Sequence, residues 1–238
     1  MKPSARDLAA LLVVDQAGLT NVPTADSVSE LAPEQAVETA LAWHLARVEA
    51  RVEGNAQPLK PVRVDDQWAE GTDPTRYPAL CVRGRTSTPR DAITGVPVQV
   101  DGQDVISDDG RWALWSVGED VGEGFVHVFA TYKAHRNALR RSVEEALSGD
   151  LNALTSLALP LPEAALPPPF VGLFDPAQFP RVRISLGGQS DNVDDESAAA
   201  GGIWRADVPF RWQAPRLSAR PRIPDLKSAL GVQIDSET

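Results

Sequence analysis

Two segments in the last third of the chain alternate between apolar and polar residues, which is the period of a half-buried β-strand. In the first segment, 181–186, one face carries Val182, Ile184 and Leu186, and the other carries Arg181, Arg183 and Ser185. The second, 204–212, places on one face Trp204, Ala206, Val208, Phe210 and Trp212, and on the other Arg205, Asp207 and Arg211. Both segments are therefore predicted to be antiparallel strands that pack one face on a core.

The stretch that joins these strands, Gly187 to Gly202, is rich in Gly, Ser and Ala and strongly acidic. A tight hairpin needs only about two to five residues here, and this stretch has too few apolar residues to pack alone. Its acidic side chains are candidates for contact with another subunit: Asp191, Asp194, Asp195 and Glu196. A rigid sheet that projects a flexible loop favours assembly over catalysis.

Apolar residues at helical spacing predict three helices. A short one covers Ala5 to Ala17, a stronger one runs from about Pro33 to Val52, and a third covers His135 to Ser148. Pro33 suits a first helical position, and Glu34 complements the positive end of the helix dipole. A glycine follows each of the two longer helices as a cap, at 54 and at 149.

Further strands are predicted at Tyr77–Arg83, Trp112–Val117 and Gly124–Tyr132, with the sequence GEDVGEG as a loop between the last two. Residues 84–111 are predicted to be an insertion that contains a small hairpin around Asp101-Gly102. We therefore expect an α+β fold, with a mixed or antiparallel sheet packed against two or three helices, in one domain that spans residues 1–238.

Prolines define the remaining connections. Seven prolines between 160 and 180 argue against any regular element there and predict an ordered connection along the surface. The residues from about 214 onward are expected to form an extended arm. Pro209 lies inside a predicted strand, and because proline cannot donate to the ladder, it predicts a sheet edge or a bulge, close to an edge between subunits.

Composition narrows the function. The net charge of −10 argues against a general nucleic-acid binder but is compatible with a conduit past which DNA slides without sticking. No apolar run approaches the length needed to span a bilayer, and the N-terminus is expected to be an amphipathic helix and not a signal peptide. Cys81 is the single cysteine, so it forms no disulfide within the chain and is expected to be a buried, inert thiol.

The sequence contains no motif for nucleotide binding, metalloprotease or serine-hydrolase chemistry, and we expect no enzymatic activity, no cofactor and no metal. The acidic cluster could hold a hard cation, but it lacks the spacing of a calcium loop. The aromatic face of 204–212 is expected to be core, although it could form a stacking platform. The basic candidates for an interface lie on the opposite face or in the arm: Arg205, Arg211, Arg216, Arg220 and Arg222.

The order of these elements resembles that of the tail terminator proteins of long-tailed bacteriophages. The resemblance spans roughly residues 33–214 and is carried by the segments HRNALRRSVEEAL, FPRVRISLG and GIWRADVPFRW with the acidic loop between the last two. It implies a homo-oligomeric ring, sixfold in that family, that caps the tail tube in the neck of the virion. The implied partners are the tail tube protein, the head–tail connector proteins and the genomic DNA that passes through the ring, with no membrane; the protein would be made in the host cytoplasm.

Three other functions remain open at this point. The chain could be a different adaptor of a phage neck or baseplate, which its position in the virion would reveal. It could be a hydrolase of unrecognised type that assembles carboxylates from distant positions, which a cleft with shifted carboxyl pKa values would favour. It could also be a monomeric binding module that uses the face of Trp204 and Trp212, which exposure of those rings would support.

Overall fold

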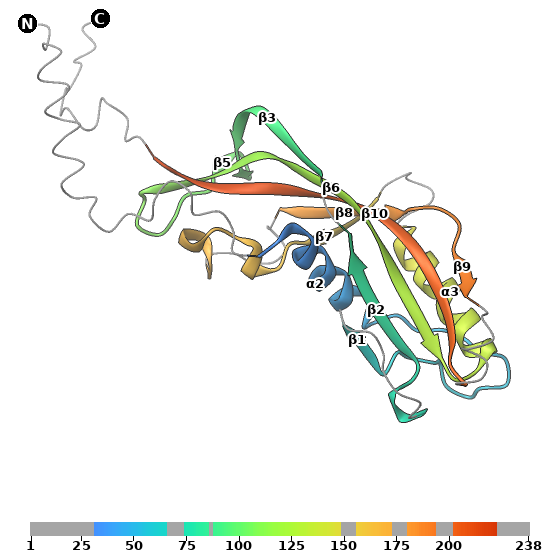
Figure 1. Cartoon of the computed structure of the whole chain (residues 1–238). Helices are drawn as coiled ribbons and strands as arrows, with labels where there is room; N and C mark the ends of the chain where they lie inside the picture. Colours follow the sequence, from blue (N-terminus) through green and yellow to red (C-terminus); the bar gives the residue numbers. More distant parts are fainter. Residues whose placement is uncertain are drawn as a thin grey trace, which may run out of the picture.

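The computed structural model describes residues 31–65, 74–85, 88–148, 156–172, 180–193 and 202–222. The chain has the expected α+β fold, with a large mixed sheet and the helices α2 (Pro33–Leu45) and α3 (Lys133–Leu147) (Figure 1). The main sheet has the order β1-β2-β6-β10-β8-β7, formed by Arg63–Asp65, Ala79–Gly84, Trp112–Ala130, Trp204–Pro221, Arg181–Leu186 and Leu157–Pro160. Strand β3 (Thr88–Pro97) also pairs with β6, and β9 (Asp191–Val193) pairs with β10. The expected helix at Ala5–Ala17 lies outside the described residues.

The two longest strands, β6 and β10, form an antiparallel ribbon that runs along the whole described fold (Figure 1). The sequence GEDVGEG is not a loop, because β6 continues through it for 19 residues, and the prediction of two separate strands was wrong. The aromatic rings of β10 explain why β6 contains glycine at positions 122 and 124. A Cβ at Gly122 would lie 2.5 Å from the ring of Trp212, and one at Gly124 would lie 2.5 Å from the carbonyl oxygen of Arg83. Glycine allows this close approach inside a strand.

The residues expected to form an arm from about 214 instead continue β10 to Pro221. They pair with the first part of β6 across a change of register between Arg216 and Leu217, where β6 contributes one extra residue. Such a bulge increases the local twist of the ribbon. Residues 223–238 lie outside the described part of the chain.

Pro209 does not lie in an edge strand, because β10 pairs with β6 on one side and with β9 and β8 on the other. Its position is the gap between the residues of β10 that pair with β9 and those that pair with β8. Its carbonyl oxygen accepts a hydrogen bond of 2.8 Å from the amide of Gly187, so its main-chain groups face away from β6. Because neighbouring residues of a strand alternate in direction, Pro215 and Pro221 face the same way, and none of these prolines removes a donor from the β6–β10 ladder.

Helix α2 begins at Pro33 as expected but ends at Leu45, earlier than the predicted Val52. Beyond it the chain turns back, and Ala50 forms a β-bridge with Leu59. Val48 still packs against the core, which explains why the apolar stripe continues past the last helical residue. Helix α3 matches its prediction closely, and its stripe of Leu139, Val143 and Leu147 is fully buried.

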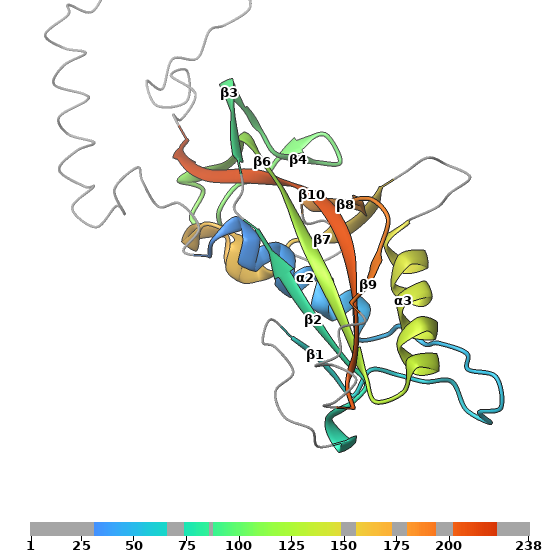
Figure 2. The same ribbon diagram turned by 45° about the vertical axis from the view of Figure 1, so that its right-hand side comes forward.

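One large hydrophobic cluster joins α2 and α3 to the sheet, and we call the face that carries Val208 and Phe210 the inner face. Val182 and Ile184 of β8 and Val208 and Phe210 of β10 belong to it, as the alternation predicts, whereas Leu186 at the end of β8 remains 38% exposed. Figure 2 shows α2 crossing behind the sheet and α3 beside β10 and β9.

The proline-rich connection closes one end of this core. Leu161, Leu166 and Phe170 are buried, which fits a connection that follows the surface. The expectation of no regular element was wrong, because β7 ends at Pro160 and two single 3-10 turns follow at Glu163–Ala165 and Pro168–Phe170. Proline is accepted at the first positions of such turns because those amides lack an internal acceptor.

The predicted insertion at 84–111 contributes β3, which extends the sheet along β6, and a small hairpin. That hairpin consists of β4 (Gln99–Val100) and β5 (Gln103–Asp104), as predicted around Asp101-Gly102. Both turn residues have positive φ, 51° and 78°, which is the geometry that an Asp-Gly dipeptide supports in a two-residue hairpin.

Candidate assembly surface

The face of the sheet opposite the helices, which we call the outer face, carries most of the polar side chains that the strands present. Residues directly across neighbouring strands share a face, so the register assigns to it the residues Cys81, Arg83, Glu123, Phe125, His127, Phe129, Arg183, Ser185, Arg205, Asp207, Arg211 and Gln213. A small apolar cluster of Tyr77, Ala79, Cys81 and Phe129 covers one end of this face. The remainder is open and charged.

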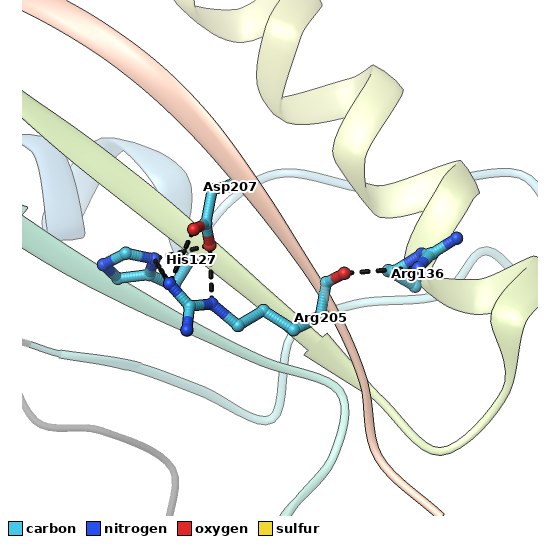
Figure 3. Close-up of polar contacts among 4 residues, drawn as sticks. All are labelled: His127, Arg136, Arg205 and Asp207. Atoms are coloured by element: carbon cyan, nitrogen blue, oxygen red, sulfur yellow. Dashed lines mark hydrogen bonds and ion pairs between the residues drawn. The ribbon is translucent and has the colours of Figure 1, made fainter. Parts of the chain in front are cut away.

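A hydrogen-bonded cluster of three side chains lies at the centre of this face (Figure 3). Arg205 donates hydrogen bonds to both carboxylate oxygens of Asp207, from Nε over 2.7 Å and from Nη2 over 2.6 Å. The same carboxylate lies 2.7 Å from Nδ1 of His127 on the neighbouring strand. The imidazole ring stacks on Phe125, with the ring centroids 5.9 Å apart. The cluster therefore ties β6 to β10 by side chains as well as by main-chain bonds.

Burial alone would raise the pKa of Asp207. The hydrogen bonds from His127 and Arg205, together with the attraction of their charges, outweigh it and hold the pKa of this carboxyl below its usual value. Asp207 is therefore ionised at neutral pH, and its charge is compensated within the cluster and is not offered to a partner.

Helix α3 supports the cluster from the inner face. The side chain of Arg136 is fully buried, and its Nη1 donates a hydrogen bond of 3.2 Å to the carbonyl oxygen of Arg205 (Figure 3). Its guanidinium also lies over the ring of Trp204, 5.7 Å from the centroid, and hydrogen-bonds to Asn137. One buried cation thus fixes the start of β10 against α3.

Cys81, His127 and Asp207 occupy directly paired positions on β2, β6 and β10. Thiol, imidazole and carboxylate in this order are the groups of a cysteine nucleophile with its base and orienting acid. However, Cys81 is only 1% exposed and lies within the small apolar cluster. A substrate has no access to its sulfur in this arrangement, so the row acts as part of the packing of the sheet.

Beside the cluster, the outer face forms a groove of about 850 Å³. Four exposed arginines line it, from four separate parts of the chain: Arg85 after β2, Arg90 in β3, Arg183 in β8 and Arg211 in β10. We call it the arginine groove. Glu123 also lies in it, 3.3 Å from Arg211, and both of these side chains are about two-thirds exposed. The groove is therefore a basic surface on a chain whose net charge is −10.

The structure divides the predicted basic interface residues between several places. Arg205 and Arg211 are on the outer face, as the alternation predicts. Arg216 instead pairs with the buried Asp120, 3.0 Å away. Arg220 lies over the ring of Trp115, 4.8 Å from the centroid, and Arg222 is exposed at the end of the described strand.

Of the acidic candidates, Asp191 is not in a loop, because it opens the short strand β9 opposite Asp207. Helix α3 holds this strand in place. Arg140 donates to the side chain of Asn192, and Ser190 donates to Glu144. Asp194, Asp195 and Glu196 lie outside the described residues, so their expected contact with another subunit stays a prediction. Within the described ranges, no group of three or more His, Cys, Asp or Glu side chains could hold a metal ion.

Sequence patterns alone do not reveal the cluster or most of the groove. They place His127 on an alternating strand between Phe125 and Phe129, and Asp207 on a polar face, but nothing local pairs residues 80 positions apart. Three of the four groove arginines come from segments that only the sheet topology brings together. The alternations of 181–186 and 204–212, which place Arg183 and Arg211 on polar faces, are the available signals.

Asp207→Asn is expected to flatten the dependence of stability on acid pH. Because the folded-state pKa of Asp207 is lowered, its contribution is present above the unfolded value of about 3.9 and is lost as pH falls through the folded value. The variant should therefore be less stable than the wild type at pH 7, and the difference should shrink below about pH 4. Urea unfolding at several pH values measures this, with Glu145→Gln on the exposed face of α3 as a control for losing one negative charge. Parallel curves for wild type and Asp207→Asn would contradict the assignment.

No protein-family model matches the chain, and no curated protein sequence matches it. Among solved structures, this chain is similar to a chain in the virion of a native gene transfer agent (GTA) particle. The match covers 75% of this chain and 94% of the other, at 13% sequence identity and a TM-score of 0.41. No helix in the described part of the chain is long and apolar enough to cross a membrane.

Proposed function

We propose that this protein is a structural component of a phage-like virion, and more specifically that its copies form a ring that caps the tail tube and joins it to the head connector. The sequence resemblance to tail terminator proteins supports this proposal through the order of its elements. In the structure α2, β2, the long β6, α3, β8 and β10 occur in that order, with shorter strands between them.

The observation that carries the proposal is the one-sided sheet. Both described helices pack on the inner face, while the outer face keeps a groove lined by exposed arginines. A chain whose opposite sides differ in this way can form a head-to-tail contact, in which one surface of each copy meets a different surface of the next. Such contacts close into rings when the rotation between copies divides a full turn.

The long ribbon gives this chain a second surface. The end formed by the first residues of β6 and the last of β10 extends past both helices (Figure 1). In the proposed ring, the ribbon ends would contact the tail tube protein on one side or the connector proteins on the other. The acidic balance of the whole chain would repel the phosphates of the genome as it passes through the ring.

Native mass spectrometry and negative-stain electron microscopy of the purified protein test the ring. We expect a closed oligomer, sixfold by the family resemblance, and a mass that increases when tail tube protein is added. A protein that stays monomeric at every concentration, alone and with tube protein, would contradict the ring. A ring that binds at the distal end of the tail would instead support a baseplate adaptor, the alternative role within the same class.

A further inference from the structure

The arginine groove collects more positive charge than its surroundings compensate. In the described part of the chain, Arg211 is the one groove arginine with an ion-pair partner, Glu123. Both members of that pair are largely exposed, so the pair contributes little to stability and can open at small cost. Arg85 lies over the ring of Phe125, while Arg90 and Arg183 form no ion pair with any described residue.

We propose that the arginine groove binds the acidic segment Asp194–Glu196 of a second copy of this chain. This inference rests on the proposed function and names the two surfaces that would meet between neighbouring subunits. The segment reads VDDESAAA from Val193, with three consecutive carboxylates followed by small side chains that fit a shallow surface. Guanidinium groups pair with carboxylates through two parallel hydrogen bonds, which gives such a contact both strength and orientation.

The groove suits several carboxylates at once. Arg211 lies opposite Ser185, and Arg183 lies opposite Gln213, so the two arginines are diagonal neighbours on adjacent strands. Diagonal neighbours have their backbones about 7–8 Å apart, and long side chains reach across this gap. Successive acidic residues of an extended segment can therefore each meet a different guanidinium.

The distances along the strands indicate that the acidic segment in the groove comes from a second copy and not from the same chain. Val193 pairs with Arg205, which is six positions from Arg211 along β10, or about 20 Å. Asp194 is one residue beyond Val193 and Glu196 is three, a reach of at most about 4–11 Å. The chain must also return to Gly202, just before β10 begins at Trp204, and this end of β10 lies far from the groove. The backbone of this segment in the same chain therefore stops well short of Arg211, whereas a second copy can place it directly in the groove.

Charge also favours a protein segment over a nucleic acid. Long-range repulsion by the net charge of −10 acts on a nucleic acid and on a second copy alike, so the charges within the groove decide between them. Glu123 adds a carboxylate within the groove itself, close to where a phosphate would have to sit. A short segment with three carboxylates meets less of this repulsion and can displace Glu123 from Arg211 locally.

A charge-swap experiment on the full chain tests the proposal. One variant reverses the groove with Arg183→Glu and Arg211→Glu, a second reverses the segment with Asp194→Lys, Asp195→Lys and Glu196→Lys, and a third combines all five changes. We expect each of the first two to weaken self-association, measured by sedimentation velocity, by roughly tenfold or more, and the combined variant to recover it. Arg141→Glu with Arg181→Glu, at exposed positions outside the groove, is the control for an equal change in charge. Circular dichroism checks that each variant is folded.

The outcomes separate this proposal from the ring itself. If the wild type forms rings and the groove-reversed variant associates with a constant within about twofold of the wild-type value, the groove assignment is overturned and the ring is left intact. The same holds if the combined variant fails to recover.

If the wild type does not self-associate, a fluorescein-labelled peptide of residues 192–200 decides the inference by titration against the monomer. Binding that falls with salt and is lost on groove reversal supports it, and absence of binding overturns it. Binding of a labelled DNA duplex at physiological salt that is lost on groove reversal, without binding of the peptide, would also overturn it.

Discussion

Arg136→Ala is expected to destabilise the protein by about 3 kcal/mol or more. The substitution removes a fully buried guanidinium that bonds to the carbonyl oxygen of Arg205, to Asn137 and to the face of Trp204. It leaves a cavity between α3 and β10, because a methyl group fills little of the space. It also leaves a main-chain acceptor without this donor, at the residue that holds Asp207 in place. Chemical denaturation followed by far-ultraviolet circular dichroism measures the change.

Arg141→Ala is the matched control for this substitution. It removes the same side chain and charge from the same helix, but at an exposed position. Its effect should remain within about 0.5 kcal/mol, as for most surface substitutions. Equal effects of the two variants would show that Arg136 contributes only helix propensity and net charge. A partial rescue by Arg136→Lys would indicate that the charge matters more than the planar shape of the guanidinium.

Gly124→Ala is expected to destabilise the protein by about 3 kcal/mol, at the upper end for overpacking a core. An added Cβ would collide with the ring of Phe210, which is fully buried, and with the carbonyl oxygen of Arg83 on the adjacent strand. Neither neighbour can move aside cheaply, because one belongs to the core and the other to the backbone of the sheet. In an open strand the same substitution would instead stabilise slightly by reducing the freedom of the unfolded chain.

Gly110→Asn provides the comparison for Gly124→Ala. Gly110 has a φ of 70°, and a Cβ built there meets nothing within 4 Å. Asparagine tolerates this left-handed conformation better than most residues, so its effect should remain within about 1 kcal/mol. Thermal unfolding of the two variants separates crowding from the general cost of replacing a glycine. A larger loss at Gly110 than at Gly124 would contradict a steric conflict with Phe210 and Arg83.

The parts of the fold that the sequence predicted are those with a strong local period. The alternation at 181–186 and 204–212 gave the inner and outer faces of β8 and β10, with Val182, Ile184, Val208 and Phe210 correctly in the core. The helical stripe of Leu139, Val143 and Leu147 gave α3. These patterns survive because burial of one face requires them, whatever the rest of the chain does.

The errors arose where a distant residue decides the local structure. The sequence GEDVGEG has the composition of a loop but forms part of β6, where Gly122 and Gly124 leave room for the rings of Trp212 and Phe210 on β10. Pro209 suggested an edge, since no local signal shows that its missing amide faces a gap between β8 and β9. Arg136 continues the apolar stripe three residues before Leu139, and its burial could have been suspected from that position alone.

The candidate surface was partly within reach of the sequence for a similar reason. Arg205 and Arg211 were predicted to lie on a polar face, and the structure keeps them there. The groove, however, needs Arg85, Arg90 and Arg183 beside Arg211, and this neighbourhood depends on the order of β3, β6, β10 and β8 in the sheet. Strand order is set by long-range pairing, which single-residue periodicity does not encode.

The prolines of β10 limit strand addition by other chains before the protein assembles. Beyond Gln213, the side of β10 that faces away from β6 has no partner strand among the described residues. Pro215 and Pro221 both point their main chain to that side and offer carbonyl oxygens without amide hydrogens. A stray strand that tried to add there would lose hydrogen bonds at both positions, which discourages fibril growth. This stretch of the ribbon is therefore a poor template for the addition of a strand from another copy.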